Sequence, residues 1–177
     1  MIQVKEIVFP QVKVIQKKRF SDERGFFLET YRRPLYEEVG ILDTFVQDNH
    51  SFSKEGTIRG MHFQSTPGQG KLISVIHGRI YDVFVDIRPG SPSFGKWGSY
   101  ILDADNFEQL YIPVGFAHGF AALSDVHLLY KVSSLFDPEA EMTFRFDDET
   151  LGIDWPISNP ILSEKDRLAP SFEEVCL

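Results

Sequence analysis

Short hydrophobic stretches separated by turn residues fill the middle of the chain. They cover residues 72–76, 80–87, 98–102, 109–113, 119–123 and 126–132. In the second stretch, Tyr81, Val83 and Val85 alternate with polar residues such as Asp82, which is the pattern of a strand with two different faces. Turns at intervals of roughly 8–12 residues are typical of sandwiches and small barrels, not of a parallel α/β sheet. The pattern therefore predicts a mainly β fold, one barrel with a few short helices.

The regions on either side of this centre have a different character. A short helix is expected at 34–40, because Pro34 suits the first helical turn and Gly40 suits the position after the last one. The segment after residue 137 is rich in loops and prolines. We predict a single domain over residues 1–177, with N-terminal strands in 1–44, a barrel core in 45–136 and a C-terminal segment, 137–177, that wraps the barrel.

Composition argues against several classes of function. The 177 residues carry a net charge of −8, which is the opposite of what nucleic acid or an anionic membrane attracts. Cys176 is the only cysteine, so no intrachain disulfide and no cysteine metal site is expected. Residues 1–10 lack the parts of a signal peptide, and no apolar run reaches the roughly 18 residues of a membrane span. We expect a cytoplasmic protein whose partners are neither nucleic acid nor membrane.

Two stretches resemble the paired motifs of cupin barrels. They are 56–64, which contains His62 and Gln64, and 113–120, which contains His118. Cupins usually place His-x-His and a Glu in the first motif and a His in the second, and these four ligands hold one divalent metal. Here Gln64 replaces the second histidine, and Lys71 lies where the Glu is expected. Two imidazoles alone make a poor site for zinc, iron or manganese, so we expect that His62 and His118 hold no metal ion.

Further segments make the resemblance more specific. Together with the cupin motifs, they resemble the dTDP-4-dehydrorhamnose 3,5-epimerase family, the metal-free cupins of nucleotide-sugar metabolism. The resemblance rests on seven motifs spread over nearly the whole chain, at 22–29, 47–53, 59–64, 82–92, 112–120, 151–156 and 163–166. It implies a cupin-type jelly-roll β barrel. It also implies a homodimer in which the N-terminal strands cross to the neighbouring chain.

The reaction that this resemblance implies is a cofactor-independent isomerisation. It inverts C3 and C5 of dTDP-4-dehydro-6-deoxy-D-glucose and gives dTDP-4-dehydro-6-deoxy-L-mannose, on the route to dTDP-L-rhamnose. Both carbons flank the C4 ketone, so a positioned base can remove their hydrogens and an acid across the pocket can protonate the opposite face. Three alternatives stay open: a mono-epimerase acting at C3 or C5 alone, a non-catalytic cupin that binds a sugar nucleotide, and a metal-dependent cupin isomerase or oxygenase.

The resemblance assigns catalytic roles to four residues. His62 is the candidate base, Asp166 would hold its ring, Tyr130 is the candidate acid, and Lys71 suits the enolate oxygen. Each residue also has a structural interpretation. His62 could be a hydrogen-bonded structural histidine, Asp166 part of a helix cap that begins at Ser163, Tyr130 a buried phenol, and Lys71 a solvated lysine at the start of a strand.

Nine other residues fall on positions where the family binds its substrate. Arg24, Arg59 and Lys165 would meet the diphosphate, because a cation such as guanidinium suits phosphate oxygens. Phe136 occupies the position of a tyrosine that usually stacks on thymine, so stacking survives but a hydroxyl contact does not. The other five candidates are Glu29, Gln47, Asn49, His118 and Glu141.

One conflict concerns two of these residues. Strict alternation along a strand places Arg59 and His62 on opposite faces, whereas the resemblance places both in one pocket. An extra residue in the strand would shift the register, and Gly60 lies between the two. A β-bulge at Gly60 would resolve the conflict, and without a bulge or a strand end there, one of the two assignments is wrong.

Overall fold

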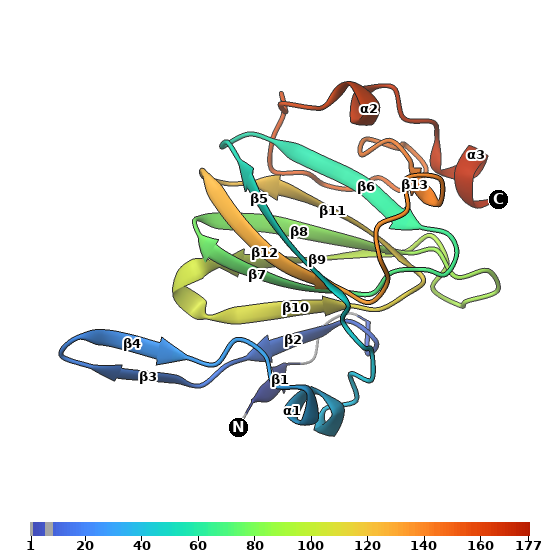
Figure 1. The fold of residues 1–177 in the computed structure, drawn as a ribbon. Coiled ribbons are helices and arrows are strands. Elements are labelled where there is room, and N and C mark those ends of the chain that lie inside the picture. Colours follow the sequence, from blue (N-terminus) through green and yellow to red (C-terminus); the bar gives the residue numbers. More distant parts are fainter. Residues whose placement is uncertain (1, 6–8) are drawn as a thin grey trace.

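Two facing antiparallel sheets form the body of the protein in a computed structural model that describes residues 2–5 and 9–177 (Figure 1). The larger sheet has the order β1 (Gln3–Lys5), β2 (Lys13–Gln16), β10 (Glu108–Ile112), β7 (Lys71–His77), β12 (Val126–Val132) and β5 (Gln47–Ser53). The other has the order β13 (Glu141–Thr143), β6 (Ile58–Gln64), β11 (Phe116–Ala122), β8 (Arg79–Asp86) and β9 (Trp97–Asp103). This is a jelly-roll barrel of the cupin type, and it confirms the predicted fold class.

The strands that the hydrophobic pattern predicts between residues 72 and 132 correspond to β7 through β12. Most of their ends agree within one or two residues, but β11 begins at Phe116, three residues before the predicted start. The side chains of Phe84, Phe116 and Leu110 are buried between the sheets, where Phe9 packs edge-on against the first two. This apolar packing fills only part of the space between the sheets. The remaining space is a cavity lined largely by polar side chains.

A hairpin and a short helix precede the barrel strands. The hairpin, β3 (Arg19–Asp22) and β4 (Gly25–Leu28), projects away from the body (Figure 1). The helix α1 (Arg33–Glu38) has Pro34 in its first turn and is followed by Gly40 at φ +78°, as the sequence predicts. Its Tyr36 packs on the outer side of the larger sheet. In the described part of the chain, no helix is long and apolar enough to cross a membrane.

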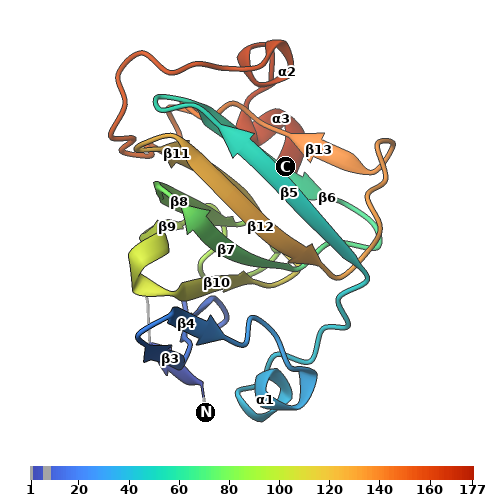
Figure 2. The same ribbon diagram turned by 60° about the vertical axis from the view of Figure 1, so that its left-hand side comes forward.

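The segment after residue 137 packs on the outer face of the smaller sheet (Figure 2). It contains β13, α2 (Glu164–Arg167) and α3 (Phe172–Cys176). Phe144 and Phe172 from this segment pack against Val83 and Val85 of β8. The strand β8 is therefore buried on both faces, and its polar face, which carries Asp82, lies inside the barrel.

The β-bulge that would resolve the conflict is present in β6. Arg59 pairs with Phe120 of β11 and His62 pairs with His118, so two residues of β6 face one residue of β11. Gly60 has a φ of +120°, and a Cβ atom there would lie 2.6 Å from the Cα atom of Gly119. Only hydrogen fits between the two strands at this position. The bulge removes the conflict, because Arg59 and His62 then face the same cavity.

The replacement Gly60→Ala tests this close approach. We expect it to lower the free energy of unfolding by about 3 kcal/mol, because backbone strain at positive φ is added to a clash with the neighbouring strand. Gly56→Ala is the matched control, since Gly56 also has a positive φ of +82° but nothing lies within 4 Å of its added Cβ. That variant should lose only about 1 kcal/mol. Urea denaturation measures both, and equal losses would contradict the packing argument.

Candidate active site

A cavity of about 400 Å³ lies between the two sheets. Its walls come from both of them: β5, β7 and β12 on one side, and β6, β11 and β13 on the other. Nine of the thirteen predicted site residues line it: Gln47, Asn49, Arg59, His62, Lys71, His118, Tyr130, Phe136 and Glu141. The fold thus brings together residues that are distributed over almost a hundred positions of the sequence.

His62 and Asp166 form a hydrogen-bonded pair at this cavity. The Nε2 atom of His62 lies 2.6 Å from Oδ1 of Asp166, which is buried. The hydroxyl of Ser163 donates to the other carboxylate oxygen at 2.8 Å and accepts the backbone N–H of Asp166, so the helix cap and the pairing with His62 coexist. Burial alone would raise the pKa of Asp166, but its hydrogen bonds with His62 and Ser163 lower it below the ordinary value.

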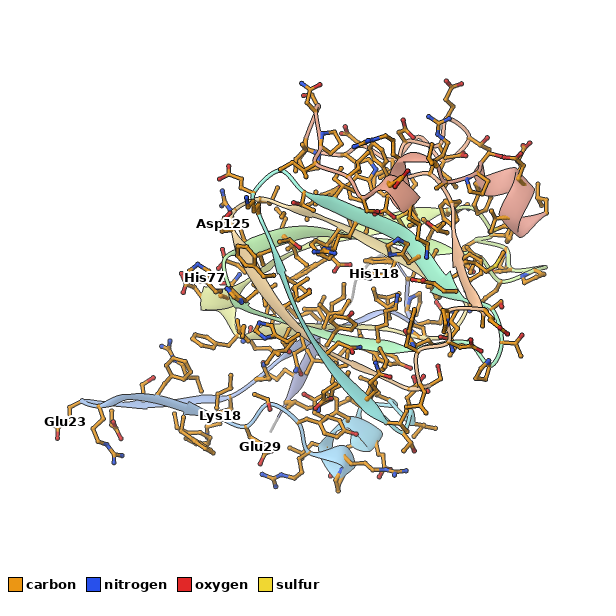
Figure 3. All side chains as sticks on the ribbon, turned by 45° about the horizontal axis from the view of Figure 1, so that its top comes forward. Lys18, Glu23, Glu29, His77, His118 and Asp125 are labelled. Atoms are coloured by element: carbon orange, nitrogen blue, oxygen red, sulfur yellow. The ribbon has the colours of Figure 1, made fainter. Side chains whose placement is uncertain are left out.

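A second histidine–aspartate pair lies beside the first. His118 is the strand partner of His62, and its Nε2 atom lies 2.9 Å from Oδ2 of Asp82 (Figure 3 shows His118 within the ring of strands). Asp82 is fully buried, and its Oδ1 atom has no hydrogen-bond partner among the described residues. Burial raises the pKa of Asp82 and lowers the pKa of His118, although the two side chains oppose these shifts in each other. Near pH 7, His118 is therefore a neutral imidazole.

Lys71 and Tyr130 face these histidines from the opposite sheet. Both line the cavity from adjacent strands, β7 and β12, where Tyr130 pairs with Ile73. Burial lowers the pKa of Lys71 to about 8, while the charges of Asp82 and Glu141 oppose the shift. Burial also raises the pKa of Tyr130. At neutral pH the cavity therefore holds a protonated amine and a protonated phenol opposite the two histidines.

Polar groups surround the mouth of the cavity. Arg59 is held by two hydrogen bonds, from Nε to Ser53 Oγ at 2.8 Å and from Nη2 to the Phe52 carbonyl at 3.0 Å. An adjoining hollow of about 450 Å³ shares Arg59 and includes Lys165, whose Nζ atom lies 2.5 Å from Oε2 of Glu141. Cations from two distant segments therefore lie next to the cavity.

The amides at the mouth are fixed by each other. Gln47 donates through Nε2 to Oδ1 of Asn49 at 2.8 Å, and its own Oε1 accepts the backbone N–H of Phe136 at 3.1 Å. Both amides lie on the inner face of β5, as their spacing predicts. Phe136 lines the same cavity and its side chain is exposed.

Four predicted residues do not line the cavity: Lys165 and Asp166 line the adjoining hollow, whereas Arg24 and Glu29 line neither. Arg24 lies in the hairpin between β3 and β4, where it pairs with Asp22. Glu29 follows the hairpin and pairs with Arg32. The two carboxylates hold their arginines on an exposed surface.

Sequence reasoning missed several residues of the site. The sequence analysis places Asp82 in an alternating strand and in the motif at 82–92 but gives it no role in the site. Ser51 continues the i, i+2 series of Gln47 and Asn49 and was accessible to the same strand-face argument. Gln69 and Phe120 had no such signal. The other missed lining residues are Ile73 and Leu128.

Gln64, which replaces a cupin metal ligand, has a structural contact instead. It donates to Ser134 and to the Leu135 carbonyl, and it accepts the backbone N–H of Asp137. The residues 2–5 and 9–177 contain no group of three or more His, Cys, Asp or Glu side chains that could hold a metal ion. That the reaction needs no metal stays a prediction.

The fold and the cavity define a class of protein: a cupin barrel whose interior holds acid–base side chains from both sheets. The family profile described as dTDP-4-dehydrorhamnose 3,5-epimerase matches residues 6–174. The chain is 46% identical to the dTDP-4-dehydrorhamnose 3,5-epimerase of Salmonella typhimurium over 181 residues, which cover 100% of this chain and 98% of that protein.

Solved structures agree with the sequence comparison. A crystal structure of dTDP-4-dehydrorhamnose 3,5-epimerase from Bacillus anthracis, with TDP and PPi bound, superposes with a TM-score of 0.94 at 45% identity and covers 97% of this chain and 100% of its own. The dTDP-6-deoxy-D-glucose-3,5-epimerase of Legionella pneumophila, in complex with dTDP-4-keto-L-rhamnose, gives 0.94 at 44% identity, with 98% and 94% covered. The chain belongs to the dTDP-4-dehydrorhamnose 3,5-epimerase family and is an isomerase.

The pairing of Asp166 with His62 makes a prediction about stability and pH. Because the folded-state pKa of Asp166 lies below its ordinary value of 3.8, the carboxylate stabilises the folded protein above about pH 4, and this contribution is lost as the pH falls through the folded pKa. We expect Asp166→Asn to cost about 2 kcal/mol at pH 7 and progressively less toward pH 3.

Asp147→Asn is the control for this measurement. Asp147 also has a lowered pKa, from its hydrogen bond with Arg145, but this ion pair is exposed. Such a pair contributes about 0–1 kcal/mol. Urea titrations at a series of pH values compare the two variants, and a loss in Asp166→Asn that does not change with pH would contradict the assigned ionisation.

Proposed function

We propose that the protein inverts C3 and C5 of dTDP-4-dehydro-6-deoxy-D-glucose and so supplies dTDP-4-dehydro-6-deoxy-L-mannose for dTDP-L-rhamnose biosynthesis, without a cofactor. One observation carries the proposal: His62 and Tyr130 lie on opposite sheets and line the same cavity. Epimerisation needs this arrangement, because one group must remove a proton from one face of the sugar and another must return a proton to the other face. The names of the relatives support the choice of substrate.

In this proposal, His62 is the base. Its Nε2 atom is held by Asp166, which leaves Nδ1 as the nitrogen that takes the proton from C3 or C5. The carboxylate fixes the tautomer and stabilises the imidazolium that forms. Loss of the proton places negative charge on the C4 oxygen, and the Lys71 ammonium in the same cavity stabilises that enolate. Tyr130, protonated at neutral pH, protonates the opposite face.

The binding of the nucleotide part rests on the groups at the mouth of the cavity. Arg59 and Lys165 would contact the diphosphate, although the protein as a whole carries a charge of −8. Phe136 would stack on the thymine. The amides of Gln47 and Asn49, together with Glu141 and the neutral His118, would supply hydrogen bonds to the sugar and the base.

A second copy of the chain would complete the site. Arg24 lies on the projecting hairpin and Glu29 directly after it, both away from the cavity of their own chain, and the hairpin exposes Phe20, Phe26 and Phe27. A groove of about 490 Å³ lies between the hairpin and the larger sheet. We propose a cytoplasmic homodimer of single-domain chains in which the N-terminal strands of each chain cross to the other and bring Arg24 to its cavity.

Solvent isotope exchange tests the reaction and its regiochemistry together. In D₂O the parent enzyme should introduce deuterium at both C3 and C5, as followed by NMR. Label at one carbon only would identify a mono-epimerase, and tight dTDP binding without any exchange would identify a binding protein. His62→Asn should lower exchange and inversion by roughly 10²–10⁴-fold, because loss of a general base removes both.

Tyr130→Phe is the matched variant for the opposite face. It keeps the base, so the enolate still forms and is reprotonated on its original face. This variant should therefore exchange deuterium faster than it inverts configuration, whereas the two rates fall together in His62→Asn. If His62→Asn keeps exchange near the parental rate, the base has been assigned to the wrong residue.

Mixed dimers test whether Arg24 acts in the partner's cavity. Arg24→Ala and His62→Asn chains, each with its own affinity tag, are co-expressed and the mixed dimer is isolated. If Arg24 crosses to the other chain, one of the two sites in the mixed dimer is intact, and about half of the parental activity returns. The homodimer of either single variant should have an activity roughly tenfold or more below that of the unmodified enzyme at low substrate concentration.

The opposite arrangement gives a different result. If Arg24 serves the cavity of its own chain, both sites of the mixed dimer carry one defect and activity does not return. A monomeric protein in sedimentation experiments would likewise contradict the proposed exchange, while the isotope experiment would still report on the reaction.

A further inference from the structure

Asp82 is a buried carboxylate that the proposed reaction does not use. It lies in β8 on the strand face that points into the barrel, together with Ile80 and Phe84 of the core. His118 of the neighbouring strand β11 contacts one of its two oxygens, Oδ2, at 2.9 Å, whereas Oδ1 has no hydrogen-bond partner among the described residues. A buried carboxylate with an unpartnered oxygen is costly, so a cation is needed nearby to balance its charge.

The imidazole of His118 does not provide this cation at neutral pH. Burial lowers the pKa of His118, and the charges of Lys71 and His62 lower it further, although Asp82 opposes the shift. The neutral ring donates its Nε2–H to the carboxylate, which leaves Nδ1 as an acceptor. This hydrogen bond orients His118 inside the barrel, but it leaves the charge of Asp82 unbalanced.

Lys71 is the cation that faces Asp82 across the inside of the barrel. It lines the cavity from β7 of the larger sheet, whereas Asp82 lies on β8 of the smaller sheet. Burial lowers the pKa of Lys71 to about 8, and the charge of Asp82 is the larger of the two that oppose this shift. Burial raises the pKa of Asp82, and Lys71 acts with His118 against that rise. Each side chain therefore stabilises the charged form of the other.

The other carboxylates near Lys71 are already engaged. Glu141 of β13 is paired with Lys165, and Asp166 of α2 is hydrogen-bonded to the candidate base. Among the described residues, Asp82 is therefore the carboxylate near Lys71 that no other cation balances. The remaining titratable or charged groups that line the cavity are not anions at neutral pH: Arg59 and His62 of β6, His118 of β11 and Tyr130 of β12.

We propose that Asp82 is a positioning residue for the reaction, whose carboxylate keeps the amine of Lys71 protonated inside the cavity. The inference rests on the proposed function, in which an ammonium at Lys71 stabilises the enolate oxygen far better than a neutral amine does. Charge, not a hydrogen bond, links the two side chains, so Asp82 does not occupy the N–H groups that the substrate needs. Asp82 does not line the cavity, and it acts through Lys71 and His118.

Lysine NMR tests the proposal on the full-length protein without ligand. The lysines carry ¹³C at Cε, and the Lys71 signal is assigned by its loss in Lys71→Arg. Its midpoint in a pH titration should lie near 8 in the parent. Asp82→Asn keeps the size of the side chain and an acceptor for His118. In this variant the midpoint should lie at least about one pH unit lower, because the nearby opposite charge is gone. Asp82→Ser, a second neutral variant, should lower it in the same way.

Glu108→Gln is the matched control for the titration. Glu108 is also a buried carboxylate, on the same face of β10 as the core residue Leu110, but it does not line the cavity. Its charge is paired with Lys5, and Tyr100 donates a hydrogen bond to it at 2.9 Å. This variant should leave the Lys71 midpoint unchanged. The proposal is overturned if the midpoint stays at the parental value in the neutral Asp82 variants, or if Glu108→Gln lowers it equally.

The pH profile of kcat/KM separates positioning from a merely structural role. Loss of the Lys71 proton should lower kcat/KM above about pH 8 in the parent, and the same fall should begin at least about one pH unit lower in Asp82→Asn. The deficit of the variant should therefore grow by roughly tenfold as the pH rises through this interval. A deficit of the same size at every pH would overturn the assigned role.

The failure of this inference is distinguishable from the failure of the proposed function. If the parent introduces no deuterium into the sugar, the proposed function fails. The lysine titration is made without substrate, so it still decides whether Asp82 keeps Lys71 protonated.

Discussion

The hydrogen bond between His62 and Asp166 is the contact on which the rest of the site depends. It joins residues 104 positions apart, one on a central strand of the smaller sheet and the other on a four-residue helix of the C-terminal segment. A buried carboxylate is costly unless it is hydrogen-bonded, so the path of that segment over the sheet is fixed at this point. Ser163 begins the helix and also holds the carboxylate. The serine that caps the helix therefore also holds Asp166, which in turn orients the candidate base His62.

The backbone of the smaller sheet determines what faces the cavity. Gly60 and Gly119 approach each other so closely that neither position accommodates a side chain without displacing the neighbouring strand. The extra residue in β6 turns both Arg59 and His62 toward the interior, which regular alternation does not allow. Placing Arg59 and His62, which are three positions apart, on the same face of one strand thus requires an extra residue between them. The glycines make this bulge possible.

Much of this could be predicted from the sequence, because it depends on local patterns. Alternation located the barrel strands and placed Gln47 and Asn49 on one face, and the conflict between Arg59 and His62 indicated the bulge. The alternation also contained the signal for Asp82, whose position inside the barrel became evident only once the C-terminal segment was seen to bury the other face of β8. The surroundings of Arg24 could not be predicted in the same way, because its hairpin projects from the body and local alternation does not indicate what lies beside it.

The negative net charge of the chain opposes the binding of an anionic nucleotide, so the proposed function depends on the cations near the cavity. The chain has a net charge of −8, and Lys165, one of the cations near the cavity, is already paired with Glu141. A diphosphate that binds Lys165 exchanges one anionic partner for another, so that contact adds less than a new ion pair would. Arg59 differs, because its described partners are the neutral Ser53 hydroxyl and the Phe52 carbonyl. Under the proposed function, Arg59 would therefore contribute more to the attraction of an anionic nucleotide than Lys165 does.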